Sequence, residues 1–166
     1  MNIYGYCRIS TAKQSIDRQI RNIKTEYPTA HIVQESYTGT SIFRPEWLKL
    51  YRILKSGDTV VFDSVSRMSR NAEEGFALYE DLYHKGIRLM FLKEHHIDTE
   101  TYKKALSGSI AMTGINVDFI LKGINEYLMA LAKEQIKLAF EQSEKEVADL
   151  HQRTREGLLT ARLNGK

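Results

Sequence analysis

The first half of the chain alternates between short apolar runs and segments in which apolar residues recur every three or four positions. The short runs are typical of strands, and the second spacing is typical of helices that bury one face. We therefore predict strands at residues 2–10, 31–35, 59–62 and 87–92. Helices are predicted at residues 13–26, from Pro45 to a stop at Gly57, and from a cap at Asn71 to a stop at Gly86.

Such an alternation of strands and helices predicts a three-layer α/β domain of flavodoxin-like type, with a mostly parallel sheet and right-handed crossovers. Residues 59–62 are apolar except for the first, as expected for a strand covered on both faces. In the first strand, period-two alternation places Cys7 on one face and Tyr6 and Arg8 on the other. We expect Cys7 to belong to the core.

The pattern changes after residue 92. Residues 93–116 are polar, with a short helix predicted near residues 100–106 and a stretch rich in Ser, Gly and Thr. From Val117 onward nothing breaks a helix until Asn164-Gly165, which gives a segment of about 47 residues and roughly 70 Å. Such a helix is too long to lie along a small domain. We expect an α/β core at residues 1–116 and a projecting helix at residues 117–166 that serves dimerisation, DNA contact, or both.

The composition adds the class of protein. The chain has 166 residues, of which 42% are hydrophobic and 27% charged, the balance of one globular domain with a real core. Cys7 is the only cysteine, which excludes a disulfide within the chain and favours a reducing, cytoplasmic setting. We see neither an export signal nor an apolar run of membrane-spanning length, so no membrane partner is expected.

Positive charge gathers at the end of the chain. The net charge is +3; residues 141–149 carry four carboxylates and one lysine, whereas residues 150–166 carry three arginines, one lysine and one glutamate. These four cations are candidates for contact with DNA phosphates: Arg153, Arg155, Arg162 and Lys166. A solvated helix face is the alternative interpretation.

Arginine and serine side chains follow three of the predicted strands, where ligands of parallel α/β sheets bind. Arg8 and Ser10 end the first strand, Arg44 lies in the loop after the second, and Arg67 and Arg70 lie in the turn after the third. Guanidinium groups stay charged and pair with phosphate oxygens in a fork geometry, and positive charge lowers the pKa of a nearby hydroxyl. The sequence therefore predicts a phosphate site with a serine nucleophile.

These residues also have ordinary structural interpretations. A serine at the place of Ser10 also serves as a helix cap, and an arginine at a strand end often forms a surface ion pair. His95 and His96 have no carboxylate or cysteine partner at ligand spacing, so we expect neither a metal nor another cofactor.

Taken together, these motifs resemble the resolvase/invertase serine recombinases. Tyr6-Cys7-Arg8-Ile9-Ser10-Thr11 resembles the family's Tyr-x-Arg-Val-Ser-Thr signature, and Gln14, Ser15 and Gln19 match the helix that follows it. Thr38-Gly39 with Arg44-Pro45 matches the Ser/Thr-Gly…Arg segment, and Ser66-Arg67-Met68-Ser69-Arg70 matches the Asp-Arg-Leu-x-Arg turn. Arg153-Thr154 and Glu156-Gly157 look like the end of the family's long helix. The matches run in order along nearly the whole chain, which is thereby identified as a catalytic domain of this family.

The resemblance implies a mechanism. Ser10 would attack a DNA backbone phosphate and become linked to the 5′ end, while Arg8, Arg67 and Arg70 bind the phosphate. Supporting roles fall to Arg44, Gln14, Gln19 and Thr38. Four subunits would cut two specific sites in double-stranded DNA, rotate and rejoin the ends without ATP or a metal, with the long helix forming the dimer interface and crossing the minor groove.

Two departures from the family pattern stand out. Ser66 occupies the place of the family's aspartate, and we hypothesise that Asp63 replaces it if the turn is helical. Asp63→Asn with unchanged cleavage, alongside an essential Ser66, would refute this. Residues 96–135 do not resemble the short resolvases, which favours a large recombinase of the transposon or phage type.

Two other functions remain open. A catalytically inactive relative would use the same fold as a DNA-bound assembly module, and Ser66 makes that conceivable. A small-molecule phosphohydrolase or flavodoxin-like binding protein would have a compact pocket and no projecting helix. No helix-turn-helix follows Lys166 in the sequence, so we expect a separate DNA-binding domain after residue 166.

Overall fold

The computed structural model describes residues 1–9, 16–36, 44–107 and 111–165. The strands are β1 (Ile3–Ile9), β2 (His31–Ser36), β3 (Thr59–Phe62) and β4 (Arg88–Phe91). The α-helices are α1 (Asp17–Glu26), α2 (Pro45–Ile53), α3 (Val65–Met68), α4 (Ala72–His84), α5 (Thr99–Ser107) and α6 (Asp118–Leu163), with a 3-10 turn, η1, at His95–Ile97.

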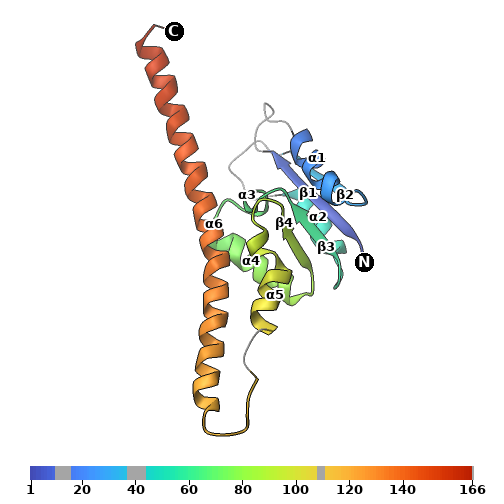
Figure 1. The fold of residues 1–166 in the computed structure, drawn as a ribbon. Coiled ribbons are helices and arrows are strands. Elements are labelled where there is room, and N and C mark those ends of the chain that lie inside the picture. Colours follow the sequence, from blue (N-terminus) through green and yellow to red (C-terminus); the bar gives the residue numbers. More distant parts are fainter. Residues whose placement is uncertain (10–15, 37–43, 108–110, 166) are drawn as a thin grey trace.

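The four strands form one parallel sheet in the order β2-β1-β3-β4 (Figure 1). This is the order of the flavodoxin-like doubly wound sheet, in which the chain winds outward from β1 in both directions. The predicted fold class is therefore confirmed. Because all strands run the same way, their carboxyl ends meet at one edge of the sheet.

Each face of the sheet has its own core. On one face Cys7, Ile23, Ala30 and Val61 pack beneath α1, which confirms the expected burial of Cys7. A Cβ at Gly5 would lie 2.8 Å from the Ile23 side chain, so α1 sits closer to β1 than a larger residue would allow.

The opposite face is aromatic. Tyr6 and Phe62 extend from neighbouring strands, with ring centroids 5.8 Å apart, and Trp47 of α2 lies edge-on to Tyr6 at 5.1 Å. Phe62 stacks on Phe91 at 5.3 Å, and Tyr79 of α4 stacks on Phe91 in turn. Offset and edge-to-face rings of this kind add to the free energy of burial, so this cluster fixes α2 and α4 on the sheet.

Several predicted boundaries were wrong. Helix α1 begins at Asp17 with Ile16 as its N-cap, whereas a start at residue 13 was predicted; residues 13–15 lie outside the described part. Helix α2 ends at Ile53 rather than continuing to Gly57. The reason is Asp58, whose carboxylate accepts the backbone N–H of Lys55 at 2.9 Å and closes a turn there.

Other boundaries were confirmed. Asn71 caps α4, its side chain accepting the N–H of Glu74 at 3.0 Å, and α5 lies where a short helix was predicted. Helix α6 runs over 46 residues to the predicted terminator, with Gly165 at φ 73°. No helix in the described ranges is long and apolar enough to cross a membrane.

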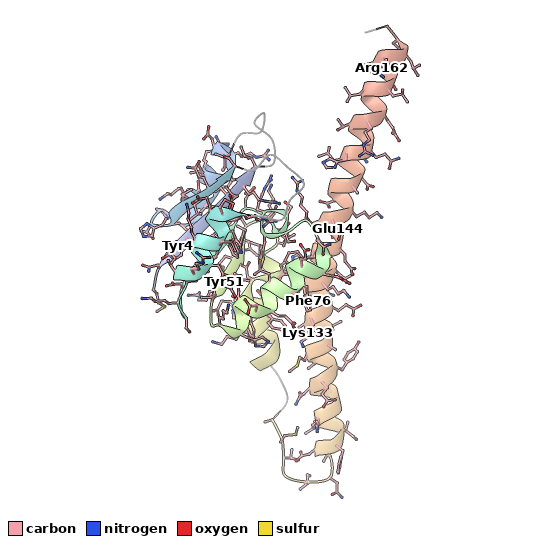
Figure 2. All side chains as sticks on the ribbon, turned by 180° about the vertical axis from the view of Figure 1, so that it is seen from behind. Tyr4, Tyr51, Phe76, Lys133, Glu144 and Arg162 are labelled. Carbon is pink, nitrogen blue, oxygen red and sulfur yellow. The ribbon has the colours of Figure 1, made fainter. Side chains whose placement is uncertain are left out.

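Helix α6 touches the core along its middle and extends past it at both ends (Figures 1 and 2). Ile136 and Phe140 are buried against the domain, whereas the predicted apolar positions Ile120 and Ile124 are exposed. At Gly75 of α4 an added Cβ would lie 2.5 Å from the Phe140 ring. The Phe140 ring can therefore pack against α4 only because residue 75 has no side chain.

Gly75→Ala is expected to lower the free energy of unfolding by about 1–3 kcal/mol, because the new methyl group collides with Phe140. Gly123→Ala is the matched control on α6: a Cβ there meets nothing within 4 Å, so the substitution should stabilise by about 0.5–1 kcal/mol. Chemical denaturation of both variants measures the difference. Equal effects would mean that the Phe140 contact does not hold α6 to the core.

Candidate active site

The carboxyl end of β1 reaches beyond its neighbour. Strand β3 ends at Phe62, opposite Tyr6, so the backbone of Arg8 has no strand partner on that side. The buried side chain of Gln19 takes its place: Arg8 N donates to Gln19 Oε1 at 3.1 Å and Gln19 Nε2 donates to Arg8 O at 2.9 Å. Gln19 thus fixes the peptide of Arg8, two residues before position 10, and its predicted role in orienting the serine stays a prediction.

Three of the predicted arginines are interlocked through backbone carbonyls. Arg8 Nη2 donates to Ser66 O at 2.8 Å, and Arg67 Nη1 donates to Arg8 O at 3.2 Å. Arg44, the N-cap residue of α2, donates through Nη1 to Met68 O. The start of α2 is thereby tied to the turn after β3, and that turn to the end of β1, so the structure brings these three side chains together.

The cluster is electrostatically crowded. Burial lowers the pKa of Arg8 to about 10, and the positive charges of Arg44, Arg70 and Arg67 contribute to the same shift. Burial also lowers the pKa of Arg67, while the nearby carboxylate of Asp63 raises it in part. The other three arginines therefore all act on Arg8, and Arg70 also acts on Arg67. Guanidinium groups that repel one another are stabilised by a bound anion, and a phosphodiester is such an anion.

The turn that carries Arg67 is helical, as the hypothesis about Asp63 required. Asp63 is 1% exposed, and its carboxylate accepts a hydrogen bond from Asn22 Nδ2 at 2.9 Å and faces Lys93 Nζ at 3.3 Å. Ser66 Oγ bonds instead to Ser64 Oγ at 2.6 Å. Asp63 is the acid that acts on Arg67, so its replacement of the family's aspartate stays a prediction with a geometric basis.

Glu35 is a residue that sequence reasoning missed. It is 2% exposed near the end of β2, and its Oε2 accepts the backbone N–H of Trp47 at 2.9 Å and the hydroxyl of Tyr6 at 3.4 Å. The first contact satisfies a free N–H in the first turn of α2. Glu35 thus holds the start of the helix next to Arg44. The signal available in the sequence was an acidic residue at the end of a predicted strand.

Lys93 and Glu94 were also missed, although they follow β4 at the same edge of the sheet. Lys93 pairs with Asp63, and Glu94 Oε2 accepts the N–H of Val65 at 3.1 Å, the start of α3. Burial raises the pKa of Glu94. Extending the strand-end argument to the fourth strand would have found both.

Other predicted site residues fall into two groups. Ser10, Gln14, Thr38 and Lys166 lie outside the described residues. Arg153, Arg155 and Arg162 are exposed on the part of α6 that extends beyond the core, where Figure 2 shows Arg162 near the end of the helix. No cluster of metal-ligating side chains occurs in the described ranges, and His95 bonds to Asp98 at 2.8 Å.

Comparisons with known proteins give the family. Residues 3–137 match the model of the resolvase N-terminal domain. The chain is 27% identical over 159 residues to the transposon Tn21 resolvase of Escherichia coli, covering 92% of this chain and 83% of that protein. It is 28% identical over 166 residues to a resolvase of Clostridium perfringens strain 13, covering 99% and 74% respectively.

Among solved structures, a resolvase family site-specific recombinase from Streptococcus pneumoniae aligns over 96% of this chain and 97% of that chain, with 20% identity and a TM-score of 0.47. The match to the family model defines a serine recombinase domain of the resolvase type. The chain belongs to the resolvase N-terminal domain family, whose matched region covers the whole sheet and the first part of α6. Membership supports a role in site-specific recombination.

Sulfate, a mimic of a phosphodiester, is expected to stabilise the protein through the arginine cluster. At roughly ten times its dissociation constant it should raise the Tm by about 3 °C. Arg8→Met should lose most of this shift, because its guanidinium lies at the centre of the cluster. Arg88→Met, which removes an exposed arginine paired with Glu100 at the amino-terminal edge of the sheet, should retain it. Differential scanning fluorimetry measures the Tm shift that sulfate causes in each variant. Equal shifts in the two variants would refute an anion site here.

Proposed function

We propose that this chain is the catalytic domain of a site-specific serine recombinase that acts on double-stranded DNA with Ser10 as its nucleophile. The observation that carries the proposal is the interlocking of Arg8, Arg44 and Arg67 at the end of β1. Ser10 follows Arg8 by two residues, so a phosphate held by these guanidinium groups lies within reach of the strand's continuation.

The proposed reaction is a phosphoryl transfer in two steps. The Ser10 oxygen attacks a backbone phosphorus and gives up its proton, a new P–O bond joins the serine to the 5′ end, and the bond to the 3′ oxygen breaks. The leaving 3′ oxygen takes up a proton, for which Arg70 is the proposed donor. Rejoining reverses these steps with a new 3′ hydroxyl. The covalent bond conserves the energy of the broken phosphodiester, so ATP and a metal are not needed.

The arginines stabilise the transition state. Among the described residues, Arg8 and Arg67 each donate to a backbone carbonyl through one nitrogen, at 2.8 Å and 3.2 Å, and these contacts leave further N–H groups on each fork. Donors that are fixed before substrate arrives need no reorganisation when negative charge develops on the phosphate oxygens. Arg44 supports them from α2, and Gln19 fixes the backbone of Arg8.

The partners follow from the same proposal. One subunit carries one proposed nucleophile, Ser10, so cutting both strands of two sites requires a dimer at each site and a tetramer during exchange. Helix α6 supplies the candidate DNA contacts Arg153, Arg155 and Arg162 on its extended end, all exposed. Contacts to phosphates position the protein on DNA without reading sequence, which leaves site selection to a further DNA-binding domain.

Ser10→Ala is expected to abolish a covalent protein–DNA adduct that forms with DNA carrying the recombination site, mapped from the junctions of the segment that bears the gene. Arg8→Lys should slow adduct formation about 100-fold, because a point charge cannot reproduce the fork. Denaturing gels after trapping with a nicked substrate measure both. Absence of an adduct with the unaltered protein would favour the catalytically inactive assembly module instead.

Arg155→Ala and Arg162→Ala are each expected to weaken DNA binding for all sequences and to reduce the slope of log affinity against log salt by about 0.9. The reason is the loss of one phosphate contact and its released counterion. Lys122→Ala, at the opposite end of α6, is the control and should leave the slope unchanged. Titrations at several salt concentrations test this, and an equal effect at position 122 would contradict it.

A further inference from the structure

A buried carboxylate stands directly behind the arginine turn. Asp63 is 1% exposed and lies four residues before Arg67. Its negative charge raises the pKa of Arg67, against the lowering by burial. A carboxylate and a guanidinium in such proximity ordinarily form a bidentate ion pair. In the described part of the chain no such pair joins them; Asp63 contacts Asn22 and Lys93 instead.

Arg67 is directed elsewhere. Its Nη1 donates to Arg8 O at 3.2 Å, and its buried Nε has no hydrogen-bond partner among the described residues. Buried donors of this kind are rare, because an unmade hydrogen bond is costly. Arg67 therefore keeps donor capacity close to a carboxylate that could satisfy it.

Asn22 and Lys93 explain why Asp63 does not turn towards Arg67. Asn22 projects from α1 and donates to Oδ1 at 2.9 Å, while Lys93, just after β4, faces Oδ2 at 3.3 Å. Oδ1 thus accepts a hydrogen bond, while Oδ2 is held by an ion pair and accepts no hydrogen bond from the described residues; the two partners come from separate elements. The side chain of Asp63 is fixed from both sides.

The segment after β4 also holds the backbone of the turn. Leu92 N donates to Phe62 O at 3.0 Å and Lys93 N donates to Asp63 O at 3.1 Å. The Glu94 carboxylate accepts the N–H of Val65 at 3.1 Å. Leu92 and Lys93 therefore extend the backbone pairing beyond β3 and β4, and the Glu94 side chain adds a contact to the start of the turn that carries Arg67.

We propose that Asn22 and Lys93 are positioning residues that occupy the carboxylate of Asp63 and thereby keep the guanidinium of Arg67 available for a DNA phosphate. This deepens the proposed function and rests on it. Asp63 then acts as a nearby counter-charge that offsets the burial of Arg67, without competing with the substrate for its N–H groups. Removing either partner frees a carboxylate oxygen, which the Arg67 fork is drawn to bind.

The proposal predicts a conditional effect. Lys93→Met should slow adduct formation about tenfold, because Arg67 becomes engaged by Asp63, while DNA affinity conferred by α6 changes little. Combined with Asp63→Asn, the Lys93→Met change should have no further effect, since the competing charge is gone. A merely structural role for Lys93 would instead add its cost in both backgrounds.

Lys85→Met is the matched control. Lys85 also pairs with a carboxylate, Asp81, at 3.1 Å, and its side chain is 47% exposed against 52% for Lys93, but it is the C-cap residue of α4, at the end of that helix away from the arginine turn. It should leave the rate of adduct formation unchanged. Asn22→Leu gives a second, independent variant and should behave as Lys93→Met does, including the lack of a further effect when it is combined with Asp63→Asn.

A second measurement separates this proposal from the proposed function. The exchange of the Arg67 Nε–H with water, followed by NMR without DNA, should slow in Lys93→Met and recover in the double variant with Asp63→Asn. Unchanged exchange, or a rate defect that Lys93→Met still adds in the Asp63→Asn background, would overturn the positioning role. If the unaltered protein forms no adduct, the recombinase proposal fails, and the exchange measurement alone decides how Asp63 is held.

Discussion

The gathering of guanidinium groups at the end of β1 is the constraint around which the sheet edge is organised. Burial and mutual repulsion lower the pKa of Arg8, so the folded chain holds these charges at a cost. Salt bridges to carboxylates would remove the cost and also the positive charge. The structure instead uses the carbonyls of Arg8, Ser66 and Met68, which accept hydrogen bonds and carry no net charge. The site thereby keeps its positive charge for an anion.

Each carbonyl in that arrangement is available because of a specific feature of the fold. Strand β3 is shorter than β1, which leaves the backbone of Arg8 for Gln19 and Arg67. The single turn of α3 presents the Ser66 carbonyl to the side of β1. Glu35 holds the first turn of α2 and so the position of Arg44. Acids are present at this edge, but they bind backbone N–H groups, hydroxyls, an amide and a lysine.

The spacing of apolar residues and the positions of Gly, Pro and Asn were enough to predict the sheet, its parallel strands and the length of α6. Strand ends were enough to predict which arginines meet, because parallel strands bring their carboxyl ends together whatever lies between them. The partners of Asp63 could not be predicted in this way. Asn22 lies on a helix 41 residues earlier, and its polar side chain reads as solvent-facing until α1 is placed over β1.

The boundaries that were wrong have the same origin. The end of α2 depends on the Asp58 carboxylate capturing Lys55 N, a contact that competes with a helical pattern favourable up to Gly57. Exposure along α6 likewise depends on where the core ends, since Ile120 and Ile136 have the same character in sequence but only Ile136 meets the domain. Local pattern fixes the period of such a helix and tertiary contact decides which turns are buried.

Helix α6 and the arginine turn meet on one short element. Glu144 of α6 accepts the backbone N–H of Ala72 at 3.0 Å (Figure 2 labels Glu144). Phe140, one turn before Glu144 on α6, fills the space over Gly75 of α4. Ala72 begins α4 and follows Arg70 by two residues. The contact that orients the projecting helix therefore also restrains the backbone at the end of the arginine turn. Any shift of α6 across α4 must change either this contact or the position of that turn, since two residues leave little slack between them.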